Sequence, residues 1–251
     1  MEYIFDTHAH YNDEAYSADL DEVISKMRST VCGAIICGTN YKSSQNCVNL
    51  AKKYSGFFYA AVGIHPEELE QEYNEQYLLN LAKSPEVIAI GEIGLDYYYD
   101  NFSKEQQKLF FEKQILTAKK ANLPIIVHDR EAHGDTLEIL KKHHPSGVLH
   151  CFSGSVETAK EVINLGMYIG VGGVITFKNA KKAADVVASL PLERLLLETD
   201  SPYLTPYPFR GSRNRSDYII YIAQKIAEIK NLDADTIIKV SRENTKNLFK
   251  I

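Results

Sequence analysis

Two histidines separated by a single residue, His8 and His10, follow the first apolar stretch of the chain. In a β-strand, alternate side chains point to the same face, so these two imidazoles can converge on one point. Imidazoles that face one point are common ligands of a divalent metal ion. The pair alone is a weak indication, because a single histidine at a strand end is more often a hydrogen-bonded or surface residue.

Further histidines and carboxylates end other apolar stretches in the same way. They are His65, Glu92, Asp96, His128, Asp129, His150, Glu198 and Asp200. A buried cluster of such groups is costly unless a cation offsets its charge. Nitrogen and carboxylate ligands without thiolate fit Zn²⁺ or Mn²⁺, with Mg²⁺ as a third option. The HxH pair with a glutamate, two further histidines and a further carboxylate make six ligands. Six exceed the needs of one tetrahedral ion, so we expect two ions about 3.5–4 Å apart, bridged by a carboxylate and a hydroxide.

The elements that must position these side chains are short β-branched runs that alternate with longer stretches of helical periodicity. Eight strands are predicted, beginning at Tyr3, Gly33, Phe58, Val87, Pro124, Gly147, Tyr168 and Leu195. Helices are predicted over 19–29, 43–54, 103–121, 132–143, 156–165, 216–230 and 233–249. This pattern predicts an α/β fold, a (β/α)₈ TIM barrel, with an open doubly wound sheet as the competing fold. In a barrel, the C-terminal ends of the strands would bring the candidate ligands to one rim, where the metal site is expected. Cys151 follows His150 directly and is expected to face away from the site, so we do not expect it to be a ligand.

The composition, 45% hydrophobic and 24% charged, is that of an ordinary soluble globular protein, and residues 1–251 are read as a single domain. Four cysteines without a CxxC pair indicate a reducing compartment. We see no signal peptide and no apolar run near the roughly 20 residues of a membrane-spanning helix, so a cytoplasmic protein without membrane association is expected. A net charge of −5 argues against bulk nucleic-acid binding, so a polyanionic substrate would need metal or a local cationic patch.

Seven segments resemble, in chain order, the signatures of the TatD family of metal-dependent deoxyribonucleases. They are DTHAH, GIHP, GEIGLDYY, IIVHDREA, HCFSG, LLLETDSPYLTP and RGSRN. The resemblance runs from Phe5 to Asn247 and implies membership of the amidohydrolase superfamily of metal-bearing TIM barrels. HxH alone is a weak motif, whereas seven segments in register are highly specific.

Carried over residue by residue, the resemblance implies a dinuclear site. The implied ligands are His8, His10 and Asp200 for one ion, His128 and His150 for the second, and Glu92 as the bridge. His65 would lie beside the site, within reach of a substrate phosphate. His133, Asp129 and the segment 214–216 depart from the family pattern, and no role is carried over to them.

The implied activity is hydrolysis of phosphodiester bonds by a 3′–5′ exonuclease acting on single-stranded or damaged DNA ends. Two cations lower the pKa of a bound water, and the resulting hydroxide would attack the phosphorus. Asp200 is the candidate general base, with Glu92 and His65 completing the catalytic set. A role for Asp200 as ligand only is the alternative.

The segment after the last predicted strand, SPYLTPYPFRGSRNRS, is rich in aromatic and basic residues. Aromatic faces stack on bases and arginines pair with phosphates. Neither contact depends on the identity of the base. The expected substrate contacts are His65, Tyr203, Arg210 and Arg213, with tyrosines 97–99 as a second aromatic loop. Loops that simply cover the barrel mouth are the alternative. We expect a monomer that acts on short single-stranded DNA ends and has no obligate protein partner.

Other functions stay open from the sequence alone. Because substrate choice lies in the loops, an amidohydrolase-type enzyme for a small ester, lactone or amide is the first alternative. A non-catalytic, metal-dependent nucleic-acid-binding protein is the second. A purely structural metal site is the third, although a barrel mouth is an unusual place for one.

Overall fold

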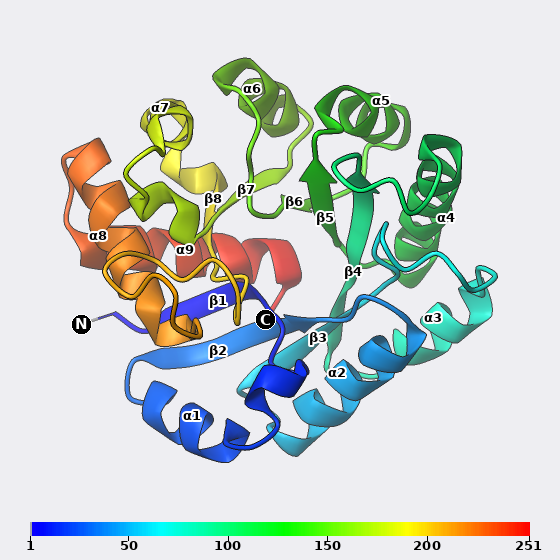
Figure 1. Cartoon of the computed structure of the whole chain (residues 1–251), viewed down its shortest axis with the longest axis horizontal. Helices are drawn as coiled ribbons and strands as arrows, with labels where there is room; N and C mark the ends of the chain where they lie inside the picture. The colour runs from blue at the N-terminus through cyan, green and yellow to red at the C-terminus, as the bar shows by residue number, and fades with distance from the viewer. Residues whose placement is uncertain (1) are drawn as a thin grey trace.

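The computed structural model describes residues 2–251 and shows strands arranged around a central barrel with helices outside them (Figure 1). The strands are β1 (Ile4–Ala9), β2 (Val31–Cys37), β3 (Phe58–Val62), β4 (Val87–Asp96), β5 (Ile125–Arg130), β6 (Gly147–Leu149), β7 (Tyr168–Val171) and β8 (Leu195–Leu197). Each strand pairs in parallel with the next, in the order of the sequence. An open doubly wound sheet would reverse its strand order part-way, so the predicted (β/α)₈ barrel is confirmed.

The helices lie on the outside of the strands. They are α1 (Leu20–Met27), α2 (Tyr41–Lys53), α3 (Glu75–Leu81), α4 (Lys104–Ala121), α5 (His133–His143), α6 (Val156–Asn164), α7 (Lys181–Ser189), α8 (Ile219–Lys230) and α9 (Ala234–Phe249). Side-chain caps fix several of their starts: Ser103 accepts a hydrogen bond from the Gln106 amide at the start of α4, as the sequence predicts. No helix within residues 2–251 has the length and apolarity needed to cross a membrane.

Apolar side chains fill the part of the barrel below the C-terminal ends of its strands. An inner cluster takes residues from most strands: Phe5, Ile35, Ala61, Ile126, Val148 and Leu196. Leu248 and Phe249, at the end of α9, belong to the same cluster. Burying an aliphatic or aromatic side chain of this size stabilises the fold by roughly 1.5–3 kcal/mol. This packing leaves the C-terminal ends of the strands as the place for a polar site.

The barrel closes where β1 meets β8, and this seam differs from the other strand pairs. Within residues 2–251 the link is an isolated bridge between Ala9 and Ser201, with the Asp200 amide donating to the His8 carbonyl at 2.9 Å. The amide of His10 donates to the Ser201 carbonyl at 2.6 Å. The seam therefore places the two histidines of β1 beside an aspartate from the other end of the chain.

A buried carboxylate, that of Asp6, holds the seam together. Its two oxygens accept hydrogen bonds from the backbone amide and hydroxyl of Thr199 at 3.0 and 2.6 Å. They also accept from the Ser216 hydroxyl at 2.6 Å and from the His8 amide at 3.1 Å. Burial raises the pKa of Asp6 to about 6, against the effect of these hydrogen bonds. Asp6 thus ties β1 to the segments that follow β8.

Candidate metal centre

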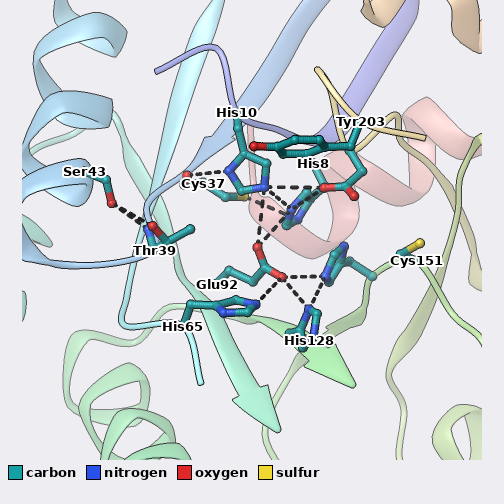
Figure 2. Close-up of polar contacts among 12 residues, drawn as sticks. His8, His10, Cys37, Thr39, Ser43, His65, Glu92, His128, Cys151 and Tyr203 are labelled. Carbon is teal, nitrogen blue, oxygen red and sulfur yellow. Dashed lines mark hydrogen bonds and ion pairs between the residues drawn. The ribbon is translucent and has the colours of Figure 1, made fainter. Parts of the chain in front are cut away.

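His8 and His10 converge as their spacing predicts. Their Nε2 atoms lie 3.1 Å apart at the C-terminal end of β1 (Figure 2). The Nδ1 atom of His10 lies 3.0 Å from the Cys37 carbonyl oxygen, which can only accept, so Nδ1 carries the hydrogen. In the neutral ring, the lone pair is then on Nε2 and points at the cluster. This is the arrangement that a metal-binding histidine adopts.

Glu92, in β4, lies between two groups of imidazoles (Figure 2). Its Oε2 lies 3.2 Å from His8 Nε2 and 3.6 Å from His10 Nε2. Its Oε1 lies 2.7 Å from His150 Nε2 and 2.8 Å from His128 Nδ1. Burial opposes ionisation, but the surrounding imidazoles, His150 first, hold the pKa of this carboxyl well below its usual range. Glu92 is therefore an ionised carboxylate with one oxygen toward each histidine pair.

Asp200 reaches the same cluster from the end of β8. Its Oδ1 lies 3.4 Å from His10 Nε2 and 3.6 Å from His8 Nε2. Burial opposes its ionisation, but the hydrogen bond with His10 and the charges of the three neighbouring imidazoles together hold the pKa of Asp200 below its ordinary value. The backbone of Asp200 has φ 60°, in the left-handed region, where the chain leaves β8.

His128 is held from both sides. Its Nδ1 faces Glu92, and its Nε2 lies 2.9 Å from Asp96 Oδ2 at the end of β4. Burial opposes charging of the ring, but hydrogen bonds with the two carboxylates outweigh it and raise the pKa of His128 to about 10. The sequence places Asp96 at a strand end without a role, and the structure makes it the partner of His128.

The side chain of His65 lies 3.5 Å from Glu92, measured from Nε2 to Oε1. Its Nδ1 accepts a hydrogen bond from the Glu67 amide at 3.2 Å, so in the neutral ring the hydrogen is on Nε2. Burial and the neighbouring His128 lower the pKa of His65, which favours that neutral form. His65 therefore presents an N–H donor to the cluster.

The donor atoms fit divalent cations. Three sets of ligand atoms lie within 4.8 Å of one another: His8, His10 and Glu92; His8, His150 and Asp200; and His65, Glu92 and His128. They combine imidazoles, which coordinate in their neutral form, with ionised carboxylates. Zn²⁺, Mn²⁺ and related ions accept this mixture of ligands. The structure thus brings together all six residues that the sequence nominates as ligands.

The cluster lies at the bottom of a cavity of about 690 Å³ at the C-terminal ends of the strands. Two of the expected substrate contacts, His65 and Tyr203, line this cavity. The Tyr203 hydroxyl donates to Asp13 Oδ2 at 2.9 Å, which fixes the ring beside His10.

The structure does not bring Arg210 and Arg213 to this cavity, contrary to the expectation from sequence. Arg213 donates to both carboxylate oxygens of Asp19, at 2.8 and 2.6 Å. The Arg210 guanidinium lies 3.7 Å from the ring centre of Phe177. Partners within the chain hold both side chains, so neither faces the metal ligands.

Cys151 also lies elsewhere than strand alternation predicts, because it lines the cavity. Strand β6 ends at Leu149, and Cys151 has φ 44°, so the alternation of a strand does not reach it. Its amide donates to Glu198, a fully buried carboxyl whose pKa burial raises to about 8. The Cys151 thiol belongs to none of the ligand sets found among residues 2–251.

The family described as "TatD related DNase" matches residues 5–250. The chain belongs to this family. Relatives of this TatD-family chain include the metal-dependent hydrolase YabD of Bacillus subtilis, which is 42% identical over 254 residues covering 99% of each chain. The crystal structure of YjjV, a TatD homologue from Escherichia coli, matches with a TM-score of 0.92 at 34% identity, covering 99% of this chain and 98% of that one. A TatD family hydrolase from Entamoeba histolytica matches with a TM-score of 0.87 at 25% identity, covering 99% of this chain and 98% of that one. The chain is therefore a TatD-family metal-dependent hydrolase, as the seven sequence segments indicate.

Proposed function

We propose that this TatD-family hydrolase is a deoxyribonuclease that uses two divalent ions and degrades single-stranded or damaged DNA from the 3′ end. The position of Glu92 is the main support: one carboxylate oxygen faces the imidazoles of β1, and the other faces His128 in β5 and His150 directly after β6. A carboxylate between two groups of ligands is suited to bridging a pair of ions. The name of the matching family supports DNA as the substrate.

The proposed ligands divide between the two sides of Glu92. His8, His10 and Asp200 would hold one ion, His128 and His150 the other, and Glu92 both. When bound, two such ions lower the pKa of a coordinated water toward neutrality and offset the negative charge of a phosphodiester. Their chemical identity is proposed as Mg²⁺, Mn²⁺ or Zn²⁺.

Two side chains have proton-handling roles in this proposal. Asp200 is ionised and lies at the cavity, so it can accept the proton of the attacking water. His65 offers its Nε2 hydrogen at the cavity wall, where it can donate to a non-bridging phosphate oxygen. These roles follow from the protonation states that burial and hydrogen bonding impose on the two groups.

The shape and charge of the protein favour strand ends over long duplexes. The chain has a net charge of −5 and a cavity of about 690 Å³, enough for a few atoms of backbone and a base beside the ions. A long duplex would need a continuous basic surface, which such a charge balance does not supply. A single frayed strand entering the cavity needs only local contacts.

The test is digestion of single-stranded DNA by the purified protein, with label on either the 5′ or the 3′ end. With Mg²⁺, Mn²⁺ or Zn²⁺ we expect a ladder of 5′-labelled products that shorten stepwise, and no products with a chelator. Glu92→Ala should abolish the activity, whereas Glu228→Ala, which changes an exposed glutamate on α8, should not.

Three outcomes would contradict parts of this proposal. Internal fragments at early times would make the enzyme an endonuclease, and 5′-to-3′ shortening would reverse its polarity. Intact DNA together with metal-dependent cleavage of a small ester, lactone or amide panel would overturn the substrate class.

A further inference from the structure

Arg130 is the only arginine or lysine, among residues 2–251, that lines the metal-centre cavity. It is the last residue of β5, two positions after His128. The other charged residues of the wall are acids and histidines, so within the described part of the chain Arg130 is the one lysine or arginine charge on this wall. A cation in this place can attract an anionic group that enters the cavity.

The guanidinium of Arg130 lies on two tyrosines of the loop after β4. Its carbon Cζ is 3.7 Å from the ring centre of Tyr98 and 5.2 Å from that of Tyr99. Within residues 2–251, its side chain has no ion pair and no hydrogen bond, so its N–H donors are unused. The two rings meet edge to face, with centres 4.8 Å apart, and are 54% and 46% exposed.

Two arginines of the loop after β8 are already paired, and a third, Arg210, lies on Phe177 away from the cavity. Arg213 binds the carboxylate of Asp19, and Arg215 binds that of Asp217 at 2.9 and 2.8 Å. These ion pairs use the planar edge of the guanidinium that would otherwise bind a phosphate in bidentate fashion. Arg130 keeps that edge free, because it is held by its flat face.

The Arg130–tyrosine cluster is joined to the metal centre through Asp96. Asp96 Oδ1 accepts hydrogen bonds from the amides of Tyr98 and Tyr99 at 2.9 and 3.4 Å, while its Oδ2 lies 2.9 Å from His128. The amide of Tyr97 donates to the Arg130 carbonyl at 2.9 Å. One carboxylate therefore fixes both a proposed metal ligand and the loop that carries the aromatic rings.

We propose that Arg130, with Tyr98 and Tyr99, binds the nucleotide next to the scissile bond. Arg130 pairs with the phosphate adjoining the one at the metal centre, and an exposed tyrosine face stacks on the neighbouring base. This inference rests on the proposed phosphodiesterase function and adds that the enzyme prefers a polynucleotide strand to an isolated diester. Neither contact reads base identity, so the preference is independent of sequence.

The test compares two substrates, a single-stranded oligonucleotide and bis(p-nitrophenyl) phosphate, which has no adjoining phosphate. For Arg130→Gln we expect kcat/KM on the oligonucleotide to fall ~10–100-fold, the range of a lost charge-assisted contact, with the small diester within twofold of the parent. Arg130→Lys should recover part of the loss, because lysine restores the positive charge but lacks the paired N–H donors of the guanidinium. The slope of log kcat/KM against log salt should become shallower by about one for Arg130→Gln.

Arg194→Gln is the matched control. Arg194 also lies on a tyrosine, 5.1 Å from the ring centre of Tyr168, and donates to the Gly166 carbonyl at 2.8 Å. It precedes β8, whereas the cavity is at the opposite ends of the strands. This substitution should leave both substrates unaffected.

Three results would overturn the inference, and they separate it from the proposed function. An unchanged oligonucleotide rate in Arg130→Gln contradicts the contact while leaving the nuclease activity intact. Equal losses on both substrates, with reduced metal content or melting temperature, would make Arg130 a structural residue. If the parent enzyme cleaves neither phosphodiester, the proposed function itself fails.

Discussion

Asp96 and His128 form a partly buried hydrogen-bonded pair, with Oδ2 of the carboxylate 2.9 Å from Nε2 of the ring. The opposite ring nitrogen, Nδ1, faces Glu92 at 2.8 Å. A carboxylate on the outer nitrogen of a metal-binding histidine fixes the ring orientation and raises the basicity of the inner nitrogen. Asp96 is therefore a positioning residue for His128, reached from the neighbouring strand.

Asp96→Asn should lower metal affinity ~10–100-fold, because the amide is a weaker and uncharged partner for the His128 ring. The asparagine oxygen can still accept from the Tyr98 amide, so the loop after β4 should be kept. Metal content after dialysis against a graded chelator measures the change. Asp21→Asn, at an exposed carboxylate of α1 that binds Lys53, is the control. Parental affinity in Asp96→Asn would show that the pair does not support the metal.

The expected pH dependence of metal binding follows from the raised pKa values of two imidazoles, those of His10 and His128. Burial opposes their charging, but hydrogen bonds with Asp200 and Asp96 raise the pKa of His10 to about 9 and that of His128 to about 10. Both values exceed the histidine pKa of about 6.5 in an unfolded chain. In the metal-free protein this stabilisation is fully present below pH 6.5 and is lost as pH rises through 9 to 10.

The metal-free melting temperature should therefore fall between pH 7 and 10. Metal affinity should rise over the same interval, because an imidazole must lose its proton to coordinate. Titration calorimetry at pH 7, in buffers of different ionisation enthalpy, should show proton release from His10 and His128 as metal binds. Binding without proton release would contradict the raised pKa values.

The sequence singles out the candidate metal ligands that the structure brings together, because each of them is a local signal. His8 and His10 share a face by strand alternation, and the other ligands sit at strand ends within recognisable segments. The alternation of strands and helices predicts the barrel but fits an open sheet as well, and the contact between β1 and the segment after β8 shows the closure. Helices α3 and α7 are both absent from the predicted helices, and the seven residues of α3 are too few for a clear helical period.

The errors and omissions concern contacts between distant parts of the chain. Arg213 pairs with Asp19 across nearly two hundred positions, and no local pattern shows that partner. For Cys151, strand alternation predicts the wrong side, because β6 has only three residues and ends at Leu149. Asp6 carries no signal of its own, since its partners Thr199 and Ser216 become neighbours only when the barrel closes.

Asp200→Asn should separate catalysis from metal binding. If Asp200 takes the proton of the attacking water, kcat should fall ~10²–10⁴-fold, the usual contribution of a general base. The amide oxygen can remain beside His10 and His8, so metal content should change much less than turnover. The measurement is kcat and bound metal per chain, each compared between Asp200→Asn and the parent enzyme. A loss of metal that accounts for the whole loss of activity would leave Asp200 as a ligand only.

Asp6 offers a test of how the barrel seam supports the site. Asp6→Ala leaves the Thr199 and Ser216 donors buried without their acceptor, so the free energy of unfolding should fall by ~2–5 kcal/mol. Asp6→Asn should lower the free energy of unfolding less, since its side-chain oxygen can still accept hydrogen bonds.

The pH dependence of stability gives a second test of Asp6. The pKa of Asp6, about 6 when folded, lies above its ordinary value of 3.8, so its ionisation destabilises the fold as pH rises through 6. Denaturant unfolding from pH 4 to 7 should therefore show a flatter pH profile for Asp6→Asn than for the parent, and parallel profiles would contradict a buried, weakly acidic Asp6.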